Sequence, residues 1–300
     1  MEHYDLHLLR GRRPDFTAVP AAARRRVFGV DYVHVRGLKG GDMYFTREGW
    51  AQAPSLLPPH WYDGQRFRQI GLALTAGTGA VYRVPVPHAL KGAMNIVVKF
   101  CRFGQDVGLT RPQAACHFPW PDAMLAGAEF LSPFAEFGRL VELRHNLRRQ
   151  LPVAFHTKRP LAIYCPPARY PRWRLGRDPA RDWLHDLPLA ADQAPAGKLA
   201  VRHDWERIYI LLYQWINGMD AQEAHESGLF DERTMIQLTQ QAARDLAAAG
   251  FAILDHKPRH VIVRHNRHGL IRRQGRPAYA LIDYELLVRF QSDSPTSPAG

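Results

Sequence analysis

The segment from Asp231 to Glu285 constrains the fold of this chain more than any other part of its 300 residues. Asp231 is a good helix N-cap, and the apolar residues that follow it recur at helical spacing until Gly250, a typical helix end. After this helix, a loop of ionisable residues from Asp255 to His260 runs directly into the short apolar strand Val261–Val263. The sequence therefore places its candidate chemistry in this loop.

A second aspartate follows the next apolar run, because the strand residues Tyr279–Ile282 lead into Asp283. Two aspartates that each end an apolar element suit a pair of complementary roles. One can accept a proton from a hydroxyl, and the other can hold a divalent metal against phosphate oxygens. The sequence contains no G-x-S-x-G elbow and no Walker G-x-x-x-x-G-K-[ST] motif, so hydrolase and P-loop interpretations lose their main support.

Two motifs in this segment resemble those of the protein-kinase-like superfamily. The run Asp255–His260 follows the catalytic-loop pattern D-x-K-P-x-N, with histidine in the place of asparagine, and Leu281–Glu285 stands where the metal-binding D-F-G would be. The pattern is most similar to that of bacterial lipopolysaccharide-core and Kdo kinases, which also have histidine five positions after the catalytic aspartate. The resemblance covers about Phe67 to Arg289, including the order of strand with lysine, helix with glutamate, hinge strand, long helix and catalytic loop.

This resemblance implies a role for each polar residue of the segment. Asp255 would orient and deprotonate an acceptor hydroxyl, and Lys257 would neutralise charge on the transferred γ-phosphoryl group. His260 and Asp283 would hold Mg²⁺, since a neutral imidazole can bind a metal or its water. ATP and Mg²⁺ are the cofactors that this scheme requires.

The N-terminal half supplies the remaining parts that the resemblance implies. Lys99, at the end of a buried strand, would orient the α- and β-phosphates of ATP. Glu136 lies in a helix that Ser132 and the following proline start, and it could be presented to Lys99. Glu142 and Glu129 are rivals for this pairing.

Two further segments would contact the nucleotide. Gly77 and Gly79 lie in a run that resembles a Gly-rich loop between two strands, where backbone N–H groups can approach phosphates, although an ordinary hairpin turn explains the same glycines. Tyr213, Gln214 and Trp215 end a buried apolar strand and would form the hinge that reads the adenine edge. A plain strand end before a turn is the alternative.

Departures from the kinase pattern leave two functions open. Ile253 and Leu254 replace the usual His-Arg before the catalytic aspartate, and only 17 residues follow Asp283, which leaves no room for a peptide-binding platform. We therefore expect a phosphotransferase that acts on a hydroxyl of a sugar or glycolipid. The alternative is a catalytically inactive pseudokinase that binds nucleotide or serves as a scaffold.

The net charge of +12 favours an anionic partner, although a GC-rich genome would also enrich arginine. Peripheral contact with an anionic membrane is one expectation, in which Arg272, Arg273 and Arg276 steer an anionic acceptor. The basic clusters lack the aromatic-glycine signature of an RNA-recognition module, so nucleic acid is not expected as a partner. A cytoplasmic location is expected from three cysteines without C-x-x-C spacing and from the lack of a secretory signal or a long apolar run.

The expected fold class is α+β, with a two-lobed kinase-like arrangement. Residues 1–66 form a β-rich N-terminal extension. Residues 67–212 form an N-lobe of mostly antiparallel sheet with one helix, interrupted by an insertion at 165–200 that has no clean period. Residues 213–300 form the hinge and a short helical C-lobe.

Overall fold

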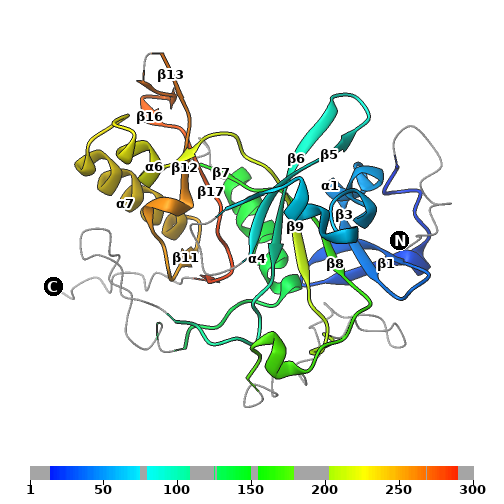
Figure 1. The fold of residues 1–300 in the computed structure, drawn as a ribbon. Helices are drawn as coiled ribbons and strands as arrows, with labels where there is room; N and C mark the ends of the chain where they lie inside the picture. The colour runs from blue at the N-terminus through cyan, green and yellow to red at the C-terminus, as the bar shows by residue number, and fades with distance from the viewer. Residues whose placement is uncertain are drawn as a thin grey trace. The chain divides into compact units, whose positions relative to one another are not determined.

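The computed structural model describes residues 14–74, 80–108, 125, 127–149, 155–178, 203–267 and 269–289 (Figure 1). The chain divides into two compact units. Unit 1 comprises Met1–Asp106, Glu129–Val141 and Lys158–Trp215, and unit 2 comprises Val107–Ala128, Glu142–Thr157 and Ile216–Gly300.

Unit 1 contains an antiparallel sheet of eight described strands in the order β1-β2-β3-β8-β9-β6-β5-β4. The strands are β1 (Arg24–Val27), β2 (Val30–Arg36), β3 (Asp42–Thr46), β4 (Leu72–Ala73), β5 (Val81–His88), β6 (Gly92–Phe100), β8 (Pro160–Cys165) and β9 (Ile210–Gln214). The apolar runs that end at Phe100 and Gln214 form strands, as their sequences predict. All six residues of β8 are buried, which fits a central strand with almost no polar side chain.

Short helices and buried aromatic side chains accompany the sheet of this unit. The helices are α1 (Arg47–Trp50) and α2 (Arg66–Gln69), with 3-10 turns at Ala21–Ala23, Ala53–Leu56, Pro58–His60, Asp63–Gln65 and Arg172–Leu175. Trp50 and Trp61 are fully buried in the core of this unit. Gly49 allows α1 to approach the sheet closely, because a Cβ atom there would lie 1.8 Å from the carbonyl oxygen of Leu161.

The helix α4 (Pro133–Arg149) starts where the sequence predicts, since the backbone N–H of Ala135 donates to the Ser132 hydroxyl at 3.3 Å. In unit 1 its apolar face buries Phe134 and Phe137 completely. The division between the units falls within this helix, after Val141.

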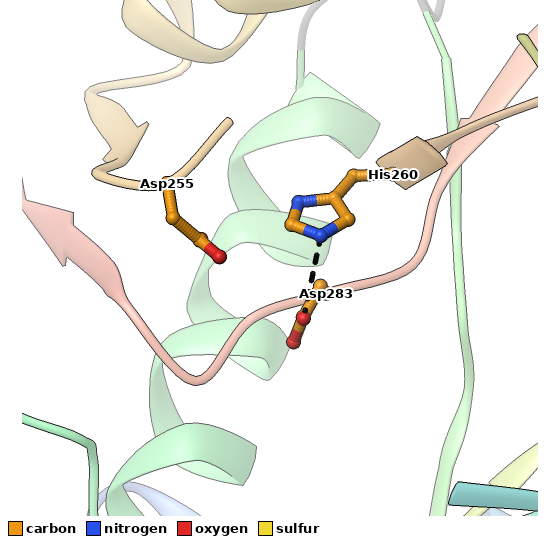
Figure 2. Close-up of side chains that lie close together, drawn as sticks. All are labelled: Asp255, His260 and Asp283. Atoms are coloured by element: carbon orange, nitrogen blue, oxygen red, sulfur yellow. Dashed lines mark ion pairs between the residues drawn. The ribbon is translucent and has the colours of Figure 1, made fainter. Parts of the chain in front are cut away.

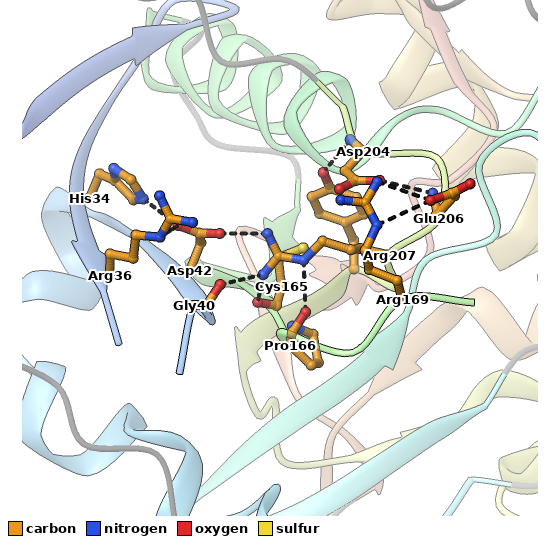
Figure 3. Close-up of polar contacts among 11 residues, drawn as sticks. His34, Arg36, Gly40, Asp42, Cys165, Pro166, Arg169, Asp204, Glu206 and Arg207 are labelled. Atoms are coloured by element: carbon orange, nitrogen blue, oxygen red, sulfur yellow. Dashed lines mark hydrogen bonds and ion pairs between the residues drawn. The ribbon is translucent and has the colours of Figure 1, made fainter. Parts of the chain in front are cut away.

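A buried ion pair connects β3 to the segment before β9 (Figure 3). Arg207 lies 2.6 Å from the Asp42 carboxylate. Its other donors reach the carbonyl oxygens of Gly40, Cys165 and Pro166. Burial alone would raise the pKa of Asp42, but hydrogen bonds from His34 and Arg207 hold that pKa below its ordinary value. The contact joins two chain segments that are far apart in sequence.

Unit 2 contains the predicted helix and strands. The helices are α6 (Ala221–Glu226) and α7 (Glu232–Ala248), with a 3-10 turn at Pro258–His260. One sheet has the order β10 (Met219–Asp220), β12 (Val261–Val263), β17 (Tyr279–Leu281) and β7 (His156–Thr157). The paired strands are β11 (Phe251–Ile253) with β18 (Leu287–Arg289), β13 (His265–Asn266) with β14 (Gly269–Leu270), and β15 (Arg272–Arg273) with β16 (Arg276–Pro277).

The boundaries of α7 confirm the sequence signals. The Asp231 side chain accepts a hydrogen bond from the Thr234 N–H at 2.8 Å, and Gly250 follows the helix with a φ of 82°. The predicted inward face is buried, at Met235, Leu238, Ala242 and Leu246.

The expectation of an α+β fold is confirmed, since the described residues combine a large antiparallel sheet with few helices. The strands β1 to β3 come from the expected extension 1–66 and are continuous with the sheet of the expected N-lobe. Of the expected insertion 165–200, residues 165–178 are described and contain one 3-10 turn, and the remainder lies outside the described residues. Among the described helices, none has both the length and the apolar character needed to cross a bilayer.

Candidate functional site

Asp255, His260 and Asp283 form a three-residue group in unit 2 (Figure 2). Each offers one ligand atom, and these atoms all lie within 4.8 Å of one another. Backbone pairing produces this juxtaposition: Val261 of β12 is opposite Leu281 of β17, and the N–H of Ile282 donates to the carbonyl of His260 at 3.2 Å. Because the two strands are antiparallel, the residue that precedes β12 lies beside the residues that follow β17.

The polar atoms of this group suit a divalent cation. His260 Nε2 lies 3.6 Å from Asp283 Oδ2, and the His260 side chain is only 7% exposed. Asp255 Oδ1 and His260 Nδ1 are both buried and have no hydrogen-bond partner among the described residues. Buried polar atoms normally have a partner, so Asp255 Oδ1 is an acceptor that a bound cation could use. Two carboxylates and an imidazole are a donor set that Mg²⁺ or Mn²⁺ can use.

Two neighbouring side chains fix the positions of the aspartates. His256 is buried and lies with Nε2 2.9 Å from the carbonyl oxygen of Thr239 on α7, which anchors the loop that carries Asp255. Burial lowers the pKa of His256 to about 4, so this imidazole is neutral near pH 7. Tyr284, which follows Asp283, is fully buried, and its hydroxyl donates to the carbonyl of Leu281. The sequence motif alone does not reveal either anchor.

Lys257 lies beside this group. Its ammonium is 3.5 Å from Asp255 Oδ2, and its side chain is 38% exposed. The ammonium is therefore within ion-pair distance of the Asp255 carboxylate. Its role in neutralising a phosphoryl group stays a prediction.

The predicted pairing of Lys99 with Glu136 is present in unit 1. The Lys99 ammonium on β6 lies 3.1 Å from Glu136 Oε1 on α4, and both side chains are almost completely buried. Of the two rivals, Glu142 instead pairs with Arg289 at 2.9 Å in unit 2. Glu129 lies before the start of α4, outside the helix that carries Glu136. The role of the buried pair in holding ATP stays a prediction.

Two further contacts around this buried pair were not predicted from the sequence. The Tyr213 hydroxyl donates to Glu136 Oε1 at 2.5 Å, so the phenol helps to fix the carboxylate. The Lys158 ammonium lies 4.3 Å from the centroid of the Tyr213 ring and is 5% exposed. The only sequence feature that could have indicated the Lys158 contact is the position of this lysine just before the apolar run that forms β8.

The residues of the expected hinge form side-chain and backbone hydrogen bonds within unit 1. The Tyr213 side chain is buried against Glu136 and is not presented to a base. The N–H groups of Gln214 and Trp215 donate to the carbonyls of Arg159 and Asn95, at 3.0 and 3.3 Å. Reading of adenine by these two N–H groups would require those hydrogen bonds to break, and the hinge role stays a prediction.

The remaining predicted residues fall into two groups. Gly77 and Gly79 lie outside the described residues. The basic loop residues Arg272, Arg273 and Arg276 form the exposed hairpin β15–β16, in which Arg272 donates to the carbonyl of Gly275. Their effect on an anionic acceptor stays a prediction.

Comparison of the chain with known proteins finds no match, either to a family model or to a curated protein.

Proposed function

We propose that this protein transfers the γ-phosphoryl group of ATP to a hydroxyl of a non-protein acceptor, a sugar or a glycolipid. The observation that carries the proposal is the Asp255–His260–Asp283 group within 4.8 Å, at the end of two paired strands. The buried Lys99–Glu136 pair supports it, because such an ion pair is a recurring part of kinase-type phosphate binding. We expect the reaction in the cytoplasm, where the free thiols Cys101 and Cys165 would stay reduced.

Phosphoryl transfer needs little covalent help from a protein, so positioning and charge neutralisation provide most of the rate. In the proposal, Asp255 accepts the proton of the acceptor hydroxyl, and Lys257 stabilises charge on the transferred group. Asp283 and His260 hold the divalent cation, which when bound neutralises phosphate oxygens. Lys99 orients the α- and β-phosphates, and Glu136 and Tyr213 keep its ammonium in place.

The histidine in the donor set bears on the choice of metal. Mg²⁺ prefers oxygen ligands, whereas imidazole is a better ligand for later divalent metals. We therefore expect Mn²⁺ to support activity at least as well as Mg²⁺. His260→Asn, which restores the kinase pattern, should shift the preference towards Mg²⁺, and activity measured over a titration of each metal tests this. An unchanged ratio of the two metals would remove His260 from the metal site.

Thermal unfolding with ATP, with and without Mg²⁺, is the first test of the proposal. A ligand at 100 times its Kd stabilises the folded protein by about 2.7 kcal/mol, which is easily measured. We expect metal-dependent stabilisation of the wild type, and its loss in Asp283→Asn. Asp31→Asn is the matched control, since Asp31 is an exposed aspartate on β2 outside the site. No stabilisation at millimolar ATP would contradict the proposal.

Transfer of labelled phosphate is the second test. Label from ATP should enter a sugar or lipid fraction and not protein, when the products are separated by size. Asp255→Asn should lower turnover by orders of magnitude. Metal-dependent stabilisation by ATP should be kept, because the Asp283 carboxylate and the His260 imidazole still offer ligands to the cation. Equal turnover in Asp255→Asn would refute the role of this carboxylate.

A nucleotide-binding or scaffolding protein without catalysis is the second candidate. Ile253 and Leu254, which replace the usual His-Arg, are both buried in unit 2 and offer no polar side chain to the loop. ATP-dependent stabilisation without transfer to any acceptor fraction would favour this candidate.

A further inference from the structure

Unit 1 has a cavity of about 270 Å³ that is distinct from the Lys99–Glu136 pair. Its wall includes three arginines, Arg102, Arg174 and Arg177, together with Gln105 and the apolar side chains of Phe100 and Leu175. Among the described residues that line it, none is an aspartate or a glutamate. The cavity is therefore strongly cationic and has apolar side chains in its wall.

The buried charge of Arg177 is the strongest indication that this cavity binds a ligand. Arg177 is only 3% exposed, and its guanidinium donates to the carbonyls of Trp205 and Arg207 and lies 4.0 Å from the centroid of the Phe103 ring. Among the described residues, no carboxylate lies within ion-pair distance of it, and Asp204 acts on it only from farther away. Burial lowers the pKa of Arg177 to about 10, so it stays charged at neutral pH. A buried charge without a counter-charge is unfavourable unless an anion approaches it.

The other two arginines are held by aromatic rings. The Arg102 guanidinium lies 4.0 Å from the centroid of Phe130, and that of Arg174 lies 5.5 Å from the centroid of Tyr170. Contact of this kind restrains a guanidinium through its face, whereas its N–H groups point outward in its plane. The cationic groups of the cavity are therefore restrained before a ligand arrives, which reduces the entropy cost of binding.

We propose that this cavity binds a phosphate monoester through Arg102, Arg174 and Arg177. Planar guanidinium groups match two phosphate oxygens at once, and several of them together select a doubly charged oxyanion. A water molecule occupies about 30 Å³ of liquid, so the cavity has room for an anion of sugar-phosphate size. The inference is independent of phosphoryl transfer, because it uses none of the residues assigned to that reaction.

The phosphate monoester has two possible sources, a soluble ester or a lipid headgroup. Trp173, next to Arg174 in the chain, is 80% exposed. An exposed tryptophan beside arginines is typical of residues that enter the interface of a bilayer. The two sources differ in their dependence on Trp173, because only a membrane would contact its ring.

Binding of glucose 6-phosphate to the whole protein, measured by calorimetry, tests the soluble source. Retention on phosphatidic acid vesicles, compared with phosphatidylcholine vesicles, tests the lipid source. The variants Arg174→Gln and Arg102→Gln remove donors from the cavity, and Arg174 is exposed, so its replacement should leave the fold intact. Arg68→Gln is the matched control, because it removes the same charge from an exposed position outside the cavity.

We expect saturable binding of at least one of these two probes, weakened at least tenfold in Arg174→Gln and in Arg102→Gln and unchanged in Arg68→Gln. If the lipid is the source, Trp173→Ala should weaken retention on vesicles and leave any binding of the soluble ester unaltered. Absence of binding to both probes would overturn the proposal. So would an equal loss in Arg68→Gln, since that result would indicate attraction to net charge alone.

Discussion

Arg207→Met should be among the most damaging single substitutions in unit 1. The side chains of Arg207 and Asp42 are mostly buried, only 13% and 10% exposed, and lie 2.6 Å apart. The substitution leaves the Asp42 carboxylate buried without its cation and removes the donor from three backbone carbonyls (Figure 3). Breaking a buried pair from one side costs about 3–5 kcal/mol, and we expect the free energy of unfolding to fall by this amount.

Urea unfolding followed by tryptophan fluorescence measures this loss, because Trp50 and Trp61 are fully buried in the core of the same sheet. Arg169→Met is the matched control. Arg169 also pairs with two carboxylates, but its side chain is 61% exposed, and exposed pairs contribute at most about 1 kcal/mol. Equal losses in the two variants would refute the argument that burial determines the contribution of this contact.

Unit 1 offers three more tests of stability. Because the folded-state pKa of Asp42 is lowered from 3.8, its stabilisation is present above pH 3.8 and is lost as the pH falls through the folded value. Below pH 3.8, the free energy of unfolding should therefore fall less steeply with pH in Asp42→Asn than in the wild type, and equal slopes would contradict this. Tyr213→Phe removes a hydrogen bond to the Glu136 carboxylate and should lower the thermal stability by about 1.5–3 kcal/mol, whereas an unchanged midpoint would mean that the phenol contributes nothing. Gly49→Ala should cost about 3 kcal/mol, since its Cβ would overlap the Leu161 carbonyl, and an unfolding midpoint equal to that of the wild type would show that α1 can move away.

The structural features that could be predicted from the sequence mostly depend on residues that are close together in the chain. The helix α7 follows from one N-cap, one apolar stripe and one glycine, all within 20 residues, and its observed ends agree with them. The group around Asp255 and Asp283 was also predictable, because two short strands lie next to polar residues and pair directly. The choice of Glu136 over two nearby glutamates depended on the register of a helix whose start Ser132 marks.

The features that the sequence did not reveal join distant segments. The cavity that contains Arg102 and Arg177 combines residues near positions 100, 175 and 208, and the segment around position 175 shows no clean period in the sequence. The contacts of Arg177 are backbone carbonyls and an aromatic ring, which have no sequence signature. The position of Lys158 against Tyr213 likewise depends on the pairing of β8 with β9, which are separated by a long stretch of chain.

The order of strands in unit 1 determines which strand lies at one edge of its sheet. Without residues 24–46, the wholly buried strand β8 would offer its unpaired backbone groups to other chains, because β3 is its neighbour on that side. With them, the edge strand on that side of the sheet is β1, whose sequence is Arg24-Arg25-Arg26-Val27. Three adjacent positive charges repel a second copy that approaches in the same way. These three arginines therefore disfavour edge-to-edge pairing of two copies along β1.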